Sequence, residues 1–105
     1  MLEEVEALAN LDEILKVEHV DVFFVAPGDL AQSMGLPGRM DDPKVQAAID
    51  DAVARIAEAG RVPGVLAAPI TVRRYRERGA RFFYISLASV LDPGAKDFLA
   101  AVRSG

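Results

Sequence analysis

The stretch Val22-Phe23-Phe24-Val25-Ala26-Pro27-Gly28-Asp29-Leu30 joins a β-branched and aromatic run to a Pro-Gly turn that carries a single carboxylate. The run is apolar throughout, which is typical of a strand buried in a parallel sheet, so we expect helices to cover both of its faces. Catalytic and metal-binding groups of α/β proteins gather at the carboxyl edge of the sheet, where loops vary without disturbing the core. Because Asp29 directly follows the strand, it is the first candidate for a functional residue.

The composition indicates an ordinary globular chain. Of the 105 residues, 51% are hydrophobic and 27% are charged, a balance that excludes a disordered chain. This length is sufficient for one core, and we expect a single domain over residues 1–105. The net charge of -4 comes without a basic block. The arginines among residues 73–78 alternate with other side chains, which favours a solvated helix face over a phosphate or nucleic-acid site.

The chain contains no cysteine, so disulfides, thiolate nucleophiles and cysteine-ligated metal centres are excluded. No apolar run reaches the ~20 residues that a bilayer span requires, and the amino end is acidic where a signal peptide is basic. We therefore expect a cytoplasmic protein without a membrane partner.

Apolar spacing and turn residues predict alternating helices and strands. A helix over 2–16 precedes the strand at 21–26, which a short helical turn at 29–34 and a loop at 35–40 follow. Asp42-Pro43 opens a helix that Gly60 ends, and a strand at 62–67 leads into a helix that Gly79 ends. A third strand at 81–87 precedes a last helix that starts at Asp92-Pro93.

Strands separated by helices imply right-handed crossovers and a parallel sheet. Three strands leave both edges of the sheet open, and a complete eightfold barrel needs ~250 residues. The predicted fold class is therefore α/β, with parallel βα units forming about half of a TIM (β/α)8 barrel.

Several segments occur together in the register of one protein family. The central one is the strand with its Pro-Gly-Asp-Leu turn and the following Met34-Gly35. The others are Leu2-Glu3, Glu6-Ala7-Leu8, Asn10-Leu11, Pro37-Gly38, Pro43 to Ile49, Gly64-Val65-Leu66, Arg74-Tyr75 and Gly79-Ala80-Arg81-Phe82. In these features the chain resembles the HpcH/HpaI class II pyruvate aldolases, whose relatives include the citrate lyase β-subunit and macrophomate synthase.

The resemblance implies a TIM barrel, of which this chain would be the part from the tail of the fifth strand to the eighth helix. It also implies a divalent ion (Mg²⁺, Mn²⁺ or Co²⁺) held by Glu3 and Asp29, with pyruvate or a related small 2-oxo acid as ligand. Hard carboxylate oxygens suit such an ion. By the same resemblance, backbone N–H groups at Gly28 and Asp29 would bind the pyruvate carboxylate.

Alternatives remain for both acids. Glu3 can instead belong to the first turn of the helix at 2–16, where acids favour the helix dipole, and Asp29 can cap the short helical turn that follows it. The chain also departs from the family pattern. Ala26 stands where a Gly is usual, and Met1 stands where a polar residue precedes the metal-binding Glu.

The family's His base and oxyanion-stabilising Arg belong to the first half of the barrel, which these residues do not include. The only histidine, His19, precedes a strand and so lies at the opposite end from the acids, out of reach of a substrate proton there. Ser86 and Ser89 have no paired base, which argues against nucleophilic catalysis. We expect the aromatic side chains of Tyr75, Phe82, Phe83 and Phe98 in the core.

Two functional hypotheses follow. In the first, the chain is part of a metal-dependent carbon–carbon lyase that is completed by a second copy in a dimer or by a chain supplying the other strands. In the second, it is a half-barrel that self-associates without catalysis. The sequence favours the second for the chain by itself, because no positioned base or oxyanion donor is present. Both hypotheses predict self-association, since bare apolar strand edges attract partners.

Overall fold

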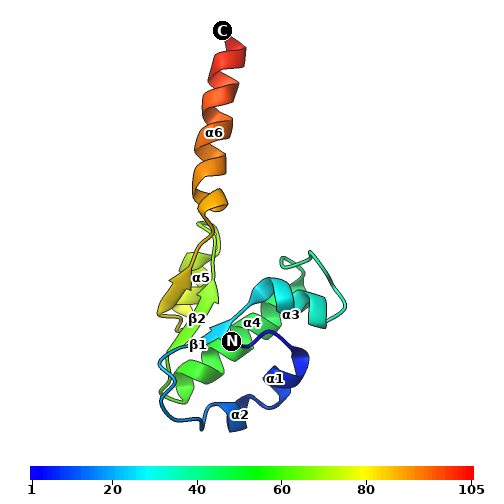
Figure 1. Cartoon of the computed structure of the whole chain (residues 1–105), viewed down its shortest axis with the longest axis vertical. Coiled ribbons are helices and arrows are strands. Elements are labelled where there is room, and N and C mark those ends of the chain that lie inside the picture. Colours follow the sequence, from blue (N-terminus) through cyan, green and yellow to red (C-terminus); the bar gives the residue numbers. More distant parts are fainter.

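The computed structural model describes all 105 residues as three parallel strands interleaved with six helices (Figure 1). In chain order the elements are α1 (Val5–Ala9), α2 (Leu11–Ile14), β1 (Phe23–Val25), α3 (Pro27–Ser33), α4 (Pro43–Glu58), β2 (Pro63–Leu66), α5 (Val72–Glu77), β3 (Phe82–Tyr84) and α6 (Leu87–Ser104). This alternation confirms the predicted βα units.

The sheet has the strand order β1-β2-β3, and both pairs are parallel. One further parallel bridge joins Leu2 to Val25 on the outer side of β1. The Leu2 N–H donates to the carbonyl of Phe24 at 2.6 Å, and the Ala26 N–H donates to the carbonyl of Leu2 at 3.0 Å. The edge at β1 is therefore partly covered, whereas we expected both edges to be bare, and only the edge at β3 stays open.

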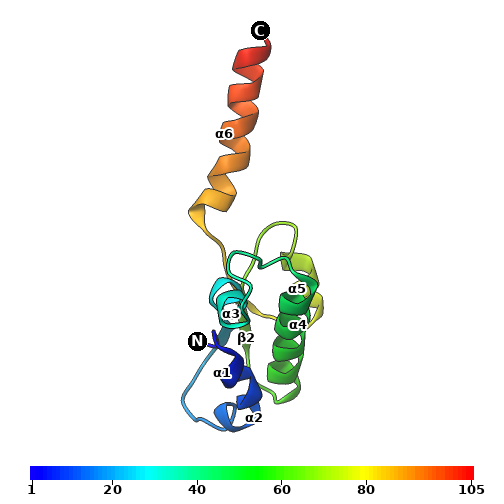
Figure 2. The same ribbon diagram turned by 90° about the vertical axis from the view of Figure 1, so that its right-hand side faces the viewer.

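Helix α4 covers one face of the sheet. Asp42 caps it by accepting the N–H of Lys44 at 2.9 Å, and Gly60, with a φ of 74°, follows its end in the left-handed conformation. Its apolar stripe forms one core cluster with strand and α2 side chains, and this cluster includes Val45, Ile49, Val53, Ile56, Val25, Val65 and Leu11. Figure 2 shows α4 and α5 on one side of β2.

The reverse face of the sheet is open, so the expectation of helices on both faces was wrong. Because side chains alternate along a strand, Phe24, Gly64 and Phe82 share this second face, and the rings of Phe24 and Phe82 meet edge to face at 6.3 Å. Phe82 is 49% exposed and Tyr84, its neighbour on the same face, is 57% exposed. In a closed barrel this face is the interior, and its covering comes from strands on the far side of the barrel.

Two helix boundaries differ from the predictions. The helix expected over 2–16 is broken at Asn10 into α1 and α2, and Leu2 lies in the bridge to β1. The last helix starts at Leu87, so Pro93 lies inside it. Ser86 caps α6 by accepting the N–H of Ser89 at 3.2 Å, and this cap replaces the expected start at Asp92-Pro93. The third strand is correspondingly shorter than the predicted 81–87.

Helix α6 projects away from the other elements as a separate rod (Figures 1 and 2). The chain measures 59 × 27 × 20 Å, and its radius of gyration is 16.1 Å, against about 13 Å for a compact domain of this length. No helix of the chain combines the length and the apolar character that a bilayer crossing demands.

The predicted aromatic core is right only for Tyr75, which is 2% exposed. Phe82, Phe83 and Phe98 are exposed, which corrects the expectation for these three residues. The physical reason is the same in each case: β3 has no further strand beside it, and α6 does not pack on the sheet.

Candidate active site at the carboxyl edge of the sheet

A polar cleft opens beside the carboxyl end of β1. It has a volume of about 490 Å³, and none of its lining residues is hydrophobic: Glu3, Glu4, Asp29, Gln32 and Ser33. The amino-terminal segment that carries Glu3 and Glu4 lies next to α1 and α3 (Figure 2). The structure therefore brings together the two acids, Glu3 and Asp29, that the sequence singled out.

Glu3 owes its position to the bridge at Leu2. That bridge makes Glu3 the residue that follows a short strand segment, and the extended backbone of Glu4 (φ −128°, ψ 150°) separates it from α1. Glu3 is thus not part of the first helical turn, which removes the alternative role in the helix dipole.

Asp29 lies in the first turn of α3, which starts at Pro27 with Ala26 as its N-cap. The capping role considered for Asp29 is therefore wrong, because the helix begins two residues earlier and no side chain caps it. The N–H groups of Gly28 and Asp29 fall in this first turn, where a helix offers no acceptors of its own. They leave two donors at the carboxyl edge of β1.

The carboxylates of the cleft form no ion pair with a positively charged side chain. None of the ion pairs in the chain includes Glu3, Glu4 or Asp29. Although three carboxylates line the cleft, no three of the chain's acidic or histidine side chains form a group that could together hold a metal ion. No more than two acidic side chains therefore come together at any one point of the cleft.

A second hollow of about 520 Å³ lies at the carboxyl ends of β2 and β3, and Pro27, Leu66, Arg74, Tyr75, Ser86 and Ser89 are among its lining residues. The Tyr75 hydroxyl donates to the Gln46 amide oxygen at 3.0 Å, and burial raises the pKa of Tyr75. The Ser86 and Ser89 hydroxyls hydrogen-bond each other at 2.7 Å and are occupied with the start of α6.

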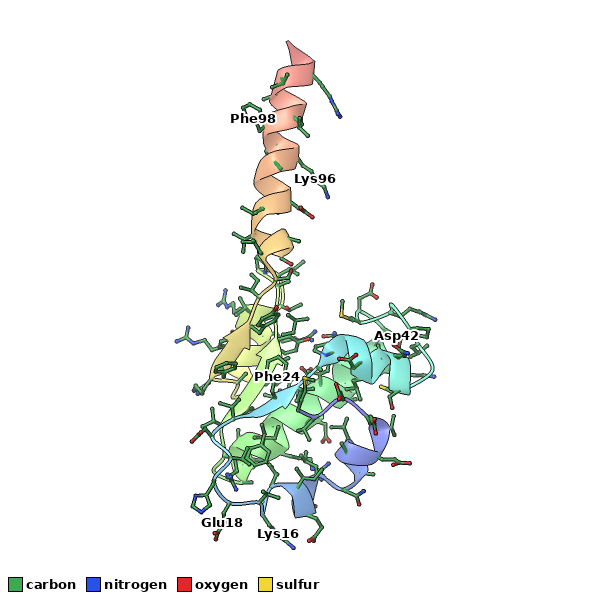
Figure 3. All side chains as sticks on the ribbon, in the orientation of Figure 1. Lys16, Glu18, Phe24, Asp42, Lys96 and Phe98 are labelled. Atoms are coloured by element: carbon green, nitrogen blue, oxygen red, sulfur yellow. The ribbon has the colours of Figure 1, made fainter.

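His19 lies far from both hollows, as predicted. It is exposed in the turn before β1, with a φ of 61°. Its neighbour Glu18 lies near the lower end of the molecule in Figure 3, above Lys16. Of the arginines in α5, Arg74 lies 3.5 Å from Asp50 and Arg73 lies 3.2 Å from Glu77, so these two form ion pairs within the chain.

The sequence did not single out Glu4, Gln32 and Ser33 as cleft residues. A signal for two of them existed, because Gln32 and Ser33 follow Asp29 by three and four residues and so share its side of a helix. Glu4 carried no such signal, since the sequence suggested that it belongs to a helix.

The comparisons with known proteins agree with this geometry. Residues 1–91 match the family described as HpcH/HpaI aldolase/citrate lyase. A 4-hydroxy-2-oxo-heptane-1,7-dioate aldolase of Shigella sonnei is 44% identical over 95% of this chain and 38% of its own length. A hydroxypyruvate/pyruvate aldolase of Pseudomonas aeruginosa is 46% identical over 86% of this chain and 34% of its own length.

A crystal structure of a family protein from Burkholderia cenocepacia J2315 superposes with a TM-score of 0.87 at 31% identity, over 97% of this chain and 40% of that protein. The chain thus spans about two fifths of the relatives that it matches, and its strands and helices are βα units of their TIM barrel. The parallel units, the acidic cleft at their carboxyl edge and these matches lead to one conclusion: the chain belongs to the HpcH/HpaI aldolase/citrate lyase family.

Proposed function

We propose that this chain is the metal- and 2-oxo-acid-binding half of a class II pyruvate aldolase barrel, in which Glu3 and Asp29 hold a divalent cation. One observation carries the proposal: two carboxylates that are 26 positions apart in the sequence line one polar cleft at the carboxyl edge of the sheet. The names of two aldolases that match the chain support the reaction class.

The donors of the cleft fit a hard cation. Every side chain that lines it offers oxygen: carboxylates from Glu3, Glu4 and Asp29, an amide from Gln32, and a hydroxyl from Ser33 that already accepts the Val5 N–H. Mg²⁺, Mn²⁺ and Co²⁺ accept such ligands, and Mg²⁺ commonly uses only one or two carboxylates and retains waters. When bound, the cation would supply Lewis acidity toward the keto oxygen of a 2-oxo acid.

The backbone at the start of α3 complements this role. We propose that the Gly28 and Asp29 N–H groups receive the carboxylate of pyruvate, because both are free donors beside Asp29 and the positive end of a helix dipole favours an anion. The protein's own contribution is then to bind and orient the 2-oxo acid, so that its carboxylate and keto oxygen face fixed groups.

Proton transfer needs groups that this chain lacks at the cleft. His19 lies at the opposite end, and no arginine lines the cleft. We therefore propose that carbon–carbon cleavage requires a second polypeptide, either another copy of this chain or a complementary half-barrel that carries the base and the oxyanion donor. The open β3 edge and the exposed apolar residues of α6 support such a partner. We place the protein in the cytoplasm, since a chain without cysteine needs no oxidising compartment.

The second candidate function is a self-associating half-barrel without aldolase activity. The specific observation in its favour is the same lack of a base and an arginine at the cleft. The two functions predict different results for turnover and agree on association, so turnover separates them.

Mn²⁺ titration by calorimetry tests the metal site. We expect Glu3→Gln and Asp29→Asn each to weaken binding at least tenfold, because each removes one of two carboxylate ligands. Glu58→Gln and Asp92→Asn are the matched controls; both residues are exposed and absent from the cleft, and both variants should bind like the parent. Parental affinity in both cleft variants would overturn the site.

Pyruvate release from a 4-hydroxy-2-oxo acid with Mn²⁺ present tests the reaction. Turnover by the self-associated chain alone would identify a second copy as the catalytic partner, whereas turnover only after a chain with the first half of a family barrel is added would identify that half as the partner. Turnover that appears with neither partner would support the non-catalytic alternative.

A further inference from the structure

The start of α1 is held by a side chain from another helix. A helix of five residues has four N–H groups without internal acceptors, and Glu4, at the N-cap, accepts none of them through its side chain. Instead, the Val5 N–H donates to the Ser33 Oγ at 2.9 Å, across 28 positions of sequence. Ser33 is the last residue of α3.

This hydrogen bond links the two segments that carry the cleft acids. Val5 follows Glu3 by two residues, and Ser33 follows Asp29 by four residues, which is one turn further along the same side of α3. Glu3 is therefore fixed from both directions. The bridge at Leu2 holds the residue before it to β1, and the bond from Ser33 holds the segment after it to α3.

We infer that Ser33 is a positioning residue that sets the separation between the carboxylates of Glu3 and Asp29. The inference rests on the proposed metal site, and it deepens that site by naming what orients its ligands. Groups that orient metal ligands commonly change metal affinity by 10- to 100-fold when they are removed. Without the Ser33 hydroxyl, the segment at Glu3 and Glu4 loses its hydrogen bond to α3 and gains freedom to move away from Asp29.

The first measurement is independent of metal. Amide hydrogen exchange followed by NMR should show faster exchange at Val5 in Ser33→Ala than in the parent, with the parental rate kept in Ser33→Thr, which retains the hydroxyl. Ser104→Ala is the matched control, because the Ser104 hydroxyl donates to the carbonyl of Ala101 at the far end of α6. An unchanged rate at Val5 in Ser33→Ala would overturn the inference.

The second measurement is Mn²⁺ affinity in a double-mutant cycle with Glu3. We expect Ser33→Ala to weaken binding about tenfold, Ser33→Thr to restore it, and Ser33→Ala to add nothing when Glu3→Gln is already present, because the serine acts through Glu3. An equal loss in both backgrounds would make Ser33 a ligand or a general structural residue and would overturn the inference. If the parent binds no Mn²⁺ while exchange at Val5 still responds to Ser33, the metal site fails and the link between the helices stands alone.

Discussion

The guanidinium carbon of Arg61 lies 4.6 Å from the centre of the Phe23 ring, at the amino ends of two neighbouring strands. The same guanidinium donates to the carbonyls of Leu15, Val17 and Val20, which belong to the segment between α2 and β1. The Arg61 side chain therefore holds in place the loop that leads into β1. It lies at the end of the sheet opposite to the acidic cleft, where barrel residues serve stability.

Arg61→Ala should lower the free energy of unfolding by about 2–4 kcal/mol. Hydrogen bonds from a charged donor contribute about 1.5–3 kcal/mol, a cation–π contact adds about 0.5–1 kcal/mol, and three carbonyls lose their donor. Urea unfolding followed by circular dichroism measures the change. Arg76→Ala is the matched control, because no ion pair or side-chain hydrogen bond of Arg76 is present, and its effect should stay within about 0.5 kcal/mol. Equal effects of the two variants would contradict the role of Arg61.

Gly64→Ala should destabilise the sheet by about 1–3 kcal/mol, because overpacking forces neighbours to move. A Cβ at Gly64 would lie 2.8 Å from Val22 Cγ1, 3.0 Å from Phe24 Cδ2 and 3.1 Å from Phe82 Cδ1. Gly94→Ala is the comparison, since nothing lies within 4 Å of a Cβ there. In Gly94→Ala we expect more helical signal from α6, because alanine favours helix interiors. A Gly64→Ala protein with the parental unfolding midpoint would contradict this prediction, because it would show that the neighbouring side chains move aside at little cost.

Tyr75→Phe should make stability less sensitive to alkaline pH. Burial raises the pKa of Tyr75 in the folded protein above the ordinary value of about 10. The unfolded chain therefore loses this proton first, and the free energy of unfolding falls as the pH rises above about 10. The parent and the exposed-site control Tyr84→Phe should both show this fall in urea titrations between about pH 9 and pH 11, one unit on either side of that value. Tyr75→Phe should show a smaller fall in the free energy of unfolding. Identical pH slopes in all three proteins would refute the raised pKa of Tyr75.

Phe98→Glu should reduce self-association. On α6, Leu87, Leu91, Phe98 and Val102 follow one another at helical spacing, all of them exposed, while Lys96 points away from Phe98 (Figure 3). A charge within this apolar stripe opposes its burial against a partner.

Ala100→Glu adds the same charge on the other side of α6 and is the control for this change. Sedimentation velocity at micromolar concentrations should show the parent and Ala100→Glu as oligomers and Phe98→Glu shifted toward monomer. A monomeric parent would contradict the association itself.

Local signals predicted most of the fold. The cap at Asp42, the stop at Gly60 and the apolar runs at β1 and β2 act within a few residues, so the sequence locates those elements closely. The start of α6 escaped prediction, because the Ser86 cap competes with the usual preference of proline for a first turn, and the cap prevails although Pro93 then lies in the helix. The exposure of Phe82 and Phe98 depends on strands and helices that these residues do not supply, and no local pattern reports on it.

The candidate site likewise has residues that the sequence predicts and one residue whose role depends on a long-range contact. Asp29 follows from its place after a buried strand, and Glu3 follows from the resemblance to the family. The contribution of Ser33 depends on a contact across 28 positions, which spacing within one helix does not reveal. The distinction between a capping and a non-capping Asp29 depended on where α3 begins, and Pro27 settles it by occupying the first helical position.

The bridge between Leu2 and Val25 holds Glu3 and Asp29 together within this chain, inside the sheet edge where further strands would join. The proposed function makes ion capture an intrachain event and carbon–carbon cleavage an interchain one, so the two can occur in sequence. A protomer already loaded with its cation would meet its complement with the cleft's negative charge neutralised, so the divalent ion concentration would set how readily the pieces come together.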